Sequence, residues 1–237
     1  MGTKEAIGWL TSAPGSDLER VFEYLKFQNH LMRKVCMNPQ ETAVVFVGYQ
    51  NDYFAKDGIL RGVVEEPHRV DEVLSNTLAF IEAVGPTTIT LIATPIVLAP
   101  DYRAMAEPVG ILYSMKEYGA FKEGSVGAQT IPEMSVFGTR ILYVTGKLGF
   151  NAFSQTALEA RLKERGIKNV LVCGMVTSLC IDSTGRAAYE KGLSVTIIRD
   201  CTSGRSAAEH DFYCENIFPL YGRAADSKVL LEELGVQ

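Results

Sequence analysis

Short apolar runs alternate with helix-like patterns along most of this chain. Each run spans four to six positions and is rich in β-branched residues, as buried strands are. Between the runs, apolar residues recur every three or four positions, which predicts helices. The predicted strands are 43–47, 88–93, 141–144, 169–173 and 194–198, and the predicted helices are 70–84, 110–117, 155–165 and 179–191. This alternation predicts an α/β fold with a doubly wound, mostly parallel sheet and helices on both faces.

Residues 1–40 stand outside this alternation. We predict that they form a helical N-terminal extension to the domain over 41–237. Ser16 and Asp17 are suitable caps for a helix whose apolar residues follow at helical spacing, and Asn38-Pro39 would end the segment. The expected role of the extension is packing on the core or on another subunit. A catalytic lid is the alternative.

The composition is that of an ordinary globular protein. Among 237 residues, 47% are hydrophobic, 22% are charged and the net charge is -5. No basic block and no apolar stretch of about 20 residues occurs, so we expect neither a nucleic-acid nor a membrane partner. Five cysteines without a CxxC pair predict reduced thiols and a cytoplasmic location. Three histidines in unrelated contexts argue against a metal site, and we expect no cofactor.

A cysteine follows the fourth predicted strand, at the sheet edge where ligands of such folds bind. Cys180 lies near the start of the next helix. The partial positive charge and free N–H groups of a helix N-terminus favour a thiolate and can hold a tetrahedral oxyanion. Cys180 is therefore either a nucleophile or a small buried core residue. Cys173, within the strand, is expected to be core.

Polar residues follow two other predicted strands. Lys147 comes after 141–144 and has glycines on both sides. If it is buried beside a cysteine, it would favour the thiolate or carry its proton; otherwise it is a solvated loop lysine. Asp52 comes after 43–47 and is either a catalytic carboxylate or a turn-capping residue.

Together these segments resemble the isochorismatase-like cysteine hydrolase superfamily, over about residues 42–235. The motifs that carry the resemblance are VGYQNDYF (47–54), GK (146–147) followed by NAF (151–153), and GMVTSLCIDSTGRAA (174–188). The last is the most specific. The resemblance implies a Rossmann-like sheet of about six parallel strands and a dimer or tetramer. It also implies hydrolysis of amide, ureido or related C–N bonds of small molecules by an Asp–Lys–Cys triad.

The motif match assigns roles to individual residues. Cys180 is similar to the nucleophile and Lys147 to the triad lysine. A cis peptide at Met175–Val176 is implied, with the N–H groups of Val176 and Cys180 as the oxyanion hole. The candidates for the substrate pocket, all near strand ends, are Gly48, Tyr53, Phe54, Ile96, Tyr102, Phe150, Phe153 and Leu179.

The chain departs from the family at Gly48, where the triad aspartate is expected. The segment after the second strand also lacks the Asp/His cluster of metal-binding members. We therefore expect a cysteine hydrolase that is weakened or redirected, with Lys147 or Asp52 as the base. A space left free at Gly48 would admit a bulkier substrate or a substrate carboxylate. The alternatives are altered chemistry by Cys180 and Lys147, and a catalytically inactive binding protein.

Overall fold

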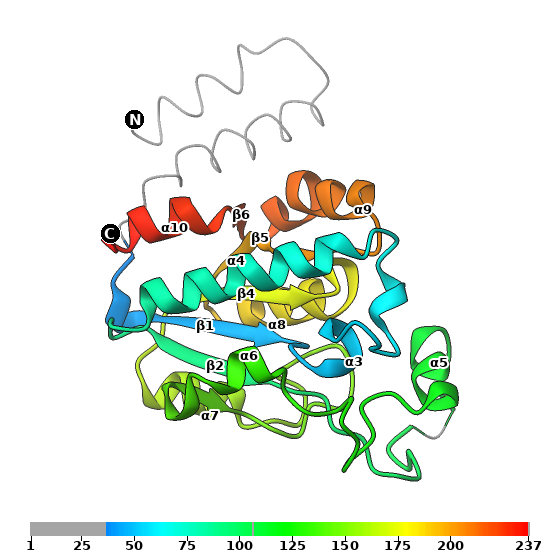
Figure 1. Ribbon diagram of the computed structural model, residues 1–237. Coiled ribbons are helices and arrows are strands. Elements are labelled where there is room, and N and C mark those ends of the chain that lie inside the picture. Colours follow the sequence, from blue (N-terminus) through cyan, green and yellow to red (C-terminus); the bar gives the residue numbers. More distant parts are fainter. Residues whose placement is uncertain (1–36, 106, 237) are drawn as a thin grey trace, which may run out of the picture. The chain divides into compact units, whose positions relative to one another are not determined.

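This computed structural model describes residues 37–105 and 107–236, which fold around one six-stranded sheet (Figure 1). The strands are β1 Thr42–Val47, β2 Thr90–Thr94, β3 Ile141–Tyr143, β4 Asn169–Met175, β5 Ser194–Ser203 and β6 Arg223–Ala225. All five neighbouring pairs are parallel, in the order β3-β2-β1-β4-β5-β6. The predicted α/β class and doubly wound sheet are confirmed, and the five predicted strands are β1 to β5.

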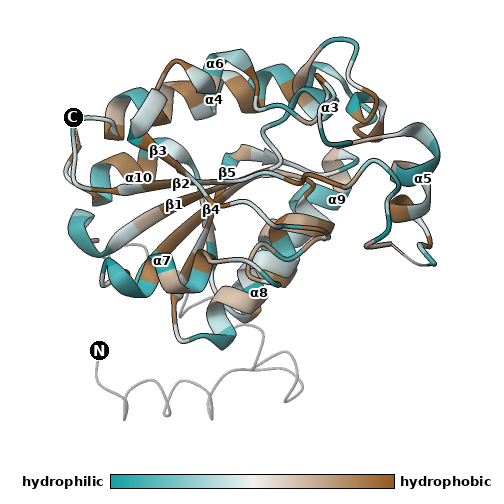
Figure 2. Cartoon of the chain, turned by 90° about the horizontal axis from the view of Figure 1, so that it is seen from below, coloured by the Kyte–Doolittle hydropathy of each residue, from teal (hydrophilic) through white to brown (hydrophobic). Residues whose placement is uncertain are grey.

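Helices cover both faces of the sheet (Figure 2). They are α3 Asn51–Phe54, α4 His68–Val84, α5 Ile111–Tyr118, α6 Pro132–Ser135, α7 Leu158–Glu164, α8 Asp182–Glu190, α9 Ala207–Phe212 and α10 Ser227–Glu233. Because successive strand residues point to opposite faces, Phe46 packs with Phe80 of α4 in one core cluster, whereas Val45 packs with Leu158 of α7 in another. The α4 face also contains α10, and the opposite face contains α8.

The structure extends the predicted pattern at its C-terminal side. β5 continues past residue 198 to Ser203, through the polar pair Arg199-Asp200. β6 was not predicted from the residues, because its three positions form no apolar run. Its buried Arg223 donates to the hydroxyl of Thr196 at 3.1 Å and pairs with Glu233, which fixes this short strand at the sheet edge.

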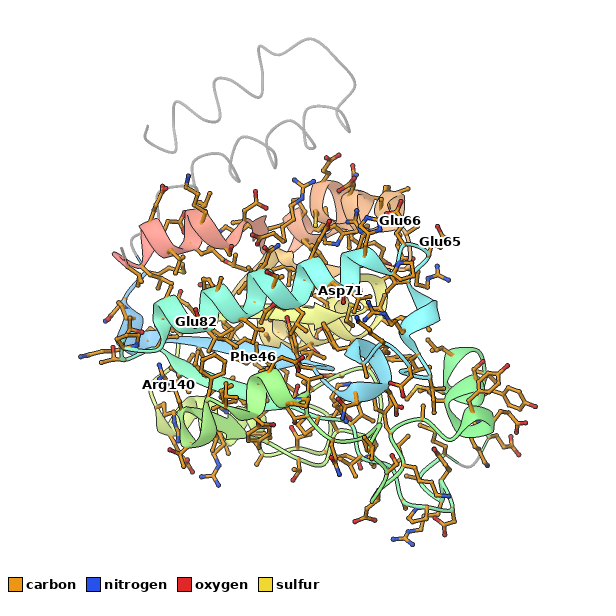
Figure 3. All side chains as sticks on the ribbon, viewed as in Figure 1. Phe46, Glu65, Glu66, Asp71, Glu82 and Arg140 are labelled. Atoms are coloured by element: carbon orange, nitrogen blue, oxygen red, sulfur yellow. The ribbon has the colours of Figure 1, made fainter. Side chains whose placement is uncertain are left out.

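The connection between α4 and β2 is held by one arginine. Arg140, just before β3, donates to the carbonyl oxygens of Gly85 at 2.8 Å and Ile89 at 2.7 Å (Figure 3). The predicted extension over residues 1–40 lies outside the described residues, except for 37–40. No helix over the described residues combines the length and apolar character needed to cross a bilayer.

Candidate active site

The chain winds outward in both directions from β1 and β4, which lie side by side in the middle of the sheet. Ligands of open α/β sheets bind beyond the carboxyl ends of the strands at this point. Gly174 permits the close pairing, since a Cβ there would lie 1.9 Å from the carbonyl oxygen of Val47, and its φ is 122°. The next peptide bond, Met175–Val176, is cis, as the resemblance implies.

The turn after β4 carries Cys180. Residues Thr177–Ile181 form one π-helical turn that runs directly into α8, where a helix from residue 179 was expected. The N–H groups of Leu179 and Ile181 both donate to the carbonyl oxygen of Val176, at 3.1 and 3.3 Å. Single π-turns are frequent at functional sites, and this one holds a thiol that is 3% exposed.

Lys147, on the segment that follows β3, meets this thiol. Its Nζ lies 3.5 Å from Sγ of Cys180 and donates to the carbonyl oxygen of Gly149 at 2.5 Å. The residue is 0% exposed, and burial lowers its pKa while the nearby Cys180 acts in the opposite direction. None of the ion pairs within the described residues includes Lys147. The amine is therefore biased toward its neutral form, which can accept a proton.

The space beside Gly48 is not free. The φ of Gly48 is +77°, and a Cβ there would lie 3.2 Å from the carbonyl oxygen of Met175 and 3.3 Å from the ring of Tyr53. The prediction of extra volume at this position is therefore wrong, because the Tyr53 ring fills it. Tyr53 is buried, and its pKa is raised by burial and by the nearby Cys180 and Asp52.

Asp52 holds a loop in place. Its Oδ2 accepts a hydrogen bond from the N–H of Phe121 at 2.6 Å, and its carboxylate fills the space where Gly127 has no side chain. Burial raises its pKa, and the bond from Phe121 opposes this. No hydrogen bond or ion pair in the described part of the chain joins it to Lys147 or Cys180. Nor does any group of three His, Cys, Asp or Glu side chains among the described residues offer a metal site.

Three other predicted pocket residues lie on segments that follow the strands. Ile96 is buried, and its backbone pairs with that of Lys147. Tyr102 is buried and donates its hydroxyl hydrogen to Ala120 at 2.8 Å. Phe150 is half-buried on the segment after Lys147.

Two further predicted pocket aromatics, Phe54 and Phe153, belong to the two core clusters. Phe54 stacks on Tyr49 with ring centres 4.8 Å apart, in the cluster on the α4 face. Phe153 lies with its ring centre 5.7 Å from Nζ of Lys191, at the end of α8 opposite Cys180.

Sequence reasoning missed Gln50, whose side chain links three segments near the site by hydrogen bonds. Its side chain is 0% exposed, accepts from the N–H of Ile96 at 2.8 Å, and donates to the carbonyl oxygens of Ile96 and Ala128 at 2.7 and 2.6 Å. It thereby joins the segments after β1 and β2 to the loop near residue 128. Its position directly after a strand, in a polar run, was the available signal.

His210 of α9 supports the turn that carries Cys180. Its Nδ1 lies 2.9 Å from the hydroxyl oxygen of Thr177, and its Nε2 lies 3.6 Å from Sγ of Cys214. Burial, together with Arg69, lowers the pKa of His210 to about 4. The ring is therefore neutral at pH 7.

This shift predicts a loss of stability in acid. The pKa of His210 is about 6.5 in the unfolded chain and about 4 in the folded one. The neutral ring therefore contributes its full stabilisation to the folded state above pH 6.5, and this stabilisation is lost as pH falls toward 4. The full effect is about 3 kcal/mol. Urea unfolding of the wild type and His210→Gln from pH 7 to pH 4 measures it. We expect the wild-type advantage to shrink on acidification; a constant difference would contradict the assignment.

Comparisons with known proteins identify the family of this chain. The family model for the isochorismatase domain matches residues 42–229. The uncharacterised isochorismatase family protein YecD of Escherichia coli O157:H7 is 34% identical over 210 residues, which is 84% of this chain and 98% of that protein. YwoC of Bacillus subtilis is 32% identical over 107 residues (45% and 56%), so the chain spans little more than half of this relative. Nicotinamidase 3 of Arabidopsis thaliana is 30% identical over 95 residues (40% and 48%).

Solved structures share the fold. A cysteine hydrolase from Pseudomonas syringae pv. phaseolicola 1448A has a TM-score of 0.73 at 17% identity, with 84% of this chain and 94% of that chain covered. The nicotinamidase PncA of Bacillus subtilis has a TM-score of 0.64 at 19% identity, with 78% and 99% covered. Since the family model matches most of its length, the chain belongs to the isochorismatase-like hydrolase superfamily.

Proposed function

We propose that this protein is a cysteine hydrolase that cleaves a C–N bond of a small amide or ureido compound, with Cys180 as nucleophile and Lys147 as its base. The contact of 3.5 Å between Nζ and Sγ, with both groups buried, carries the proposal. Relatives named nicotinamidase and ureidoacrylate amidohydrolase support the bond class. The dimer or tetramer and the cytoplasmic location stay predictions.

The first half of the reaction forms a thioester. Neutral Lys147 takes the proton from the Cys180 thiol, and the thiolate attacks the carbonyl carbon of the substrate. The N–H groups of Val176 and Cys180 hold the oxyanion that develops. When the C–N bond breaks, the Lys147 ammonium gives its proton to the departing nitrogen, which leaves as ammonia or an amine.

The second half restores the enzyme. Water attacks the thioester carbon, Lys147 takes the proton of the water, and the carbon–sulfur bond breaks. Lys147 then returns the proton to the thiolate, and the acid product leaves. Two features of Lys147 support this role without a carboxylate beside it: burial lowers the pKa of the amine, and the carbonyl oxygen of Gly149 orients it.

Thiol reactivity separates this proposal from an inactive binding protein. We expect iodoacetamide to label Cys180 at pH 7 at least about 100-fold faster than Cys173, because burial raises the pKa of Cys173 to about 12. Peptide mass spectrometry of the labelled protein gives both rates. Equal rates would overturn the proposal. Ammonia release from nicotinamide, ureidoacrylate and N-carbamoylsarcosine, with Cys180→Ala as the blank, then searches for the substrate.

Introducing a carboxylate at Gly48 is expected to fail. Gly48→Asp must accept a positive φ and displace the Tyr53 ring, so we predict a stability loss of about 1–3 kcal/mol and no faster labelling of Cys180. Gly48→Ala, which suffers the same strain without the charge, is the matched control. Thermal unfolding and iodoacetamide labelling provide the two measurements. If Gly48→Asp labelled tenfold faster than Gly48→Ala, a carboxylate would have rescued an impaired triad.

A further inference from the structure

A cavity lies between α4, α9, the end of β5 and the start of α10, four elements that Figure 1 shows grouped together. Its volume is about 320 Å³. Small-molecule sites begin at roughly this size. Cys180 and Lys147 are not among the residues that line it. One wall is His210, whose ring contacts Thr177 of the turn after β4, so the cavity is separate from the Cys180 site but borders it.

Two polar groups at this cavity lack partners. Thr202 is 2% exposed, and its hydroxyl oxygen is buried without a hydrogen bond among the described residues. Nε of Arg69 is likewise buried and unpaired there. Among the described residues, the ion-pair partner of this guanidinium is Glu66, at 3.7 Å. A buried polar group without a partner carries a desolvation cost that a ligand would remove.

Several charges at the cavity are already occupied within the protein. Asp200 accepts from the N–H and the hydroxyl of Ser227, at 2.7 and 2.6 Å. Arg199 pairs with Asp211 at 3.0 Å. These side chains fix the start of α10 and the side of α9. They line the cavity, but their charges are already paired within the protein.

The remaining charges are of both signs. Arg69 has its unpaired Nε, while the carboxylates of Glu72 and Asp226 form no ion pair within the described residues. The ring of His210 is neutral at pH 7. A simple anion would meet the repulsion of the carboxylates, and a simple cation would leave Arg69 and Thr202 unpaired. A ligand that carries both a negative and a positive charge can pair with Arg69 and Thr202 and also with the carboxylates.

We propose that this cavity binds a small zwitterion of the amino-acid class. The ligand carboxylate contacts Arg69 and Thr202, and its ammonium group contacts Glu72 and Asp226. Arg69 and Glu72 lie one helical turn apart on α4, a rise of about 4.5 Å, which suits the short separation of the two charges in an amino acid. Glu65 and Glu66 mark this end of α4 in Figure 3.

The test uses the full chain and the twenty protein amino acids as probes. We expect at least one to raise the melting temperature and to bind by calorimetry. Its N-acetyl derivative, which lacks the ammonium, and its methyl ester, which lacks the carboxylate, should each bind at least tenfold more weakly. If no amino acid binds, or if both derivatives bind equally well, the proposal is overturned.

Variants locate the site. Thr202→Val and Arg69→Met should each weaken binding at least tenfold, and Thr202→Val should raise the melting temperature without ligand because it removes an unpaired hydroxyl. Arg161→Met, on the exposed side of α7, is the matched control and should bind as the wild type. Cys180→Ala should also bind normally. Loss of binding in Cys180→Ala would place the ligand in the other site, and normal binding by both cavity variants would equally overturn the proposal.

Discussion

Exchanging Cys180 for alanine is expected to lower the turnover of any amide substrate by about 10⁴-fold or more, because no sulfur remains to form the thioester. The covalent intermediate should disappear as well. Rapid acid quenching of the wild type with substrate, followed by intact-protein mass spectrometry, should show the added acyl mass. The variant should show none.

Cys173→Ala is the matched control for this experiment. Cys173 lies seven residues earlier in β4 and is fully buried, so its replacement costs packing energy without removing a reactive group. We expect a lower melting temperature with turnover close to that of the wild type. Turnover of Cys180→Ala within tenfold of the wild type would exclude the thiol as nucleophile.

Exchanging Lys147 for methionine is expected to lower turnover by about 10³-fold and to raise stability. The variant loses the proton carrier of both half-reactions. It also removes a buried amine whose hydrogen-bond partners within residues 37–105 and 107–236 are the carbonyl of Gly149 and the thiol of Cys180, so we expect a gain of about 1–2 kcal/mol at pH 7. Urea unfolding and the acyl-enzyme assay measure the two effects.

The pH dependence of this gain checks its cause. The pKa of Lys147 is lower in the folded chain than in the unfolded one, so the unfolded wild type binds more protons between these values. Wild-type stability therefore rises with pH through this range, relative to the variant. The advantage of Lys147→Met should be largest near neutral pH and should shrink toward pH 10. Lys168→Met removes a lysine from an exposed surface ion pair and serves as the comparison. It should show neither the gain in stability at neutral pH nor the decrease of that gain toward pH 10.

The sequence was sufficient to predict most of the sheet. β1, β2 and β4 are apolar runs buried on both faces, and β3 and β5 contain enough apolar positions to be recognised as strands. β6 leaves none, because Arg223–Ala225 is short and depends on partners at Thr196 and Glu233. Lys147 and Cys180 could also be predicted to lie near each other. The carboxyl ends of parallel strands lie on the same side of a sheet, and both residues follow such an end.

Side-chain direction was harder to predict than strand position. Phe54 lies in α3 and stacks on the nearby Tyr49, whereas the ring of Phe153 faces Lys191, 38 positions away along the chain. Gln50 reaches residues 46 and 78 positions away along the chain. Such contacts leave no periodic signal in a single sequence.

The packing of the Tyr53 ring against Gly48 makes the two positions interdependent. An acidic side chain at 48 would meet the Tyr53 ring and the carbonyl oxygen of Met175, and it would have to adopt a positive φ. A smaller residue at 53 would relieve only the first of these obstacles. A carboxylate at this position therefore requires adjustment of the strand end itself, and a change of one neighbouring side chain is not sufficient.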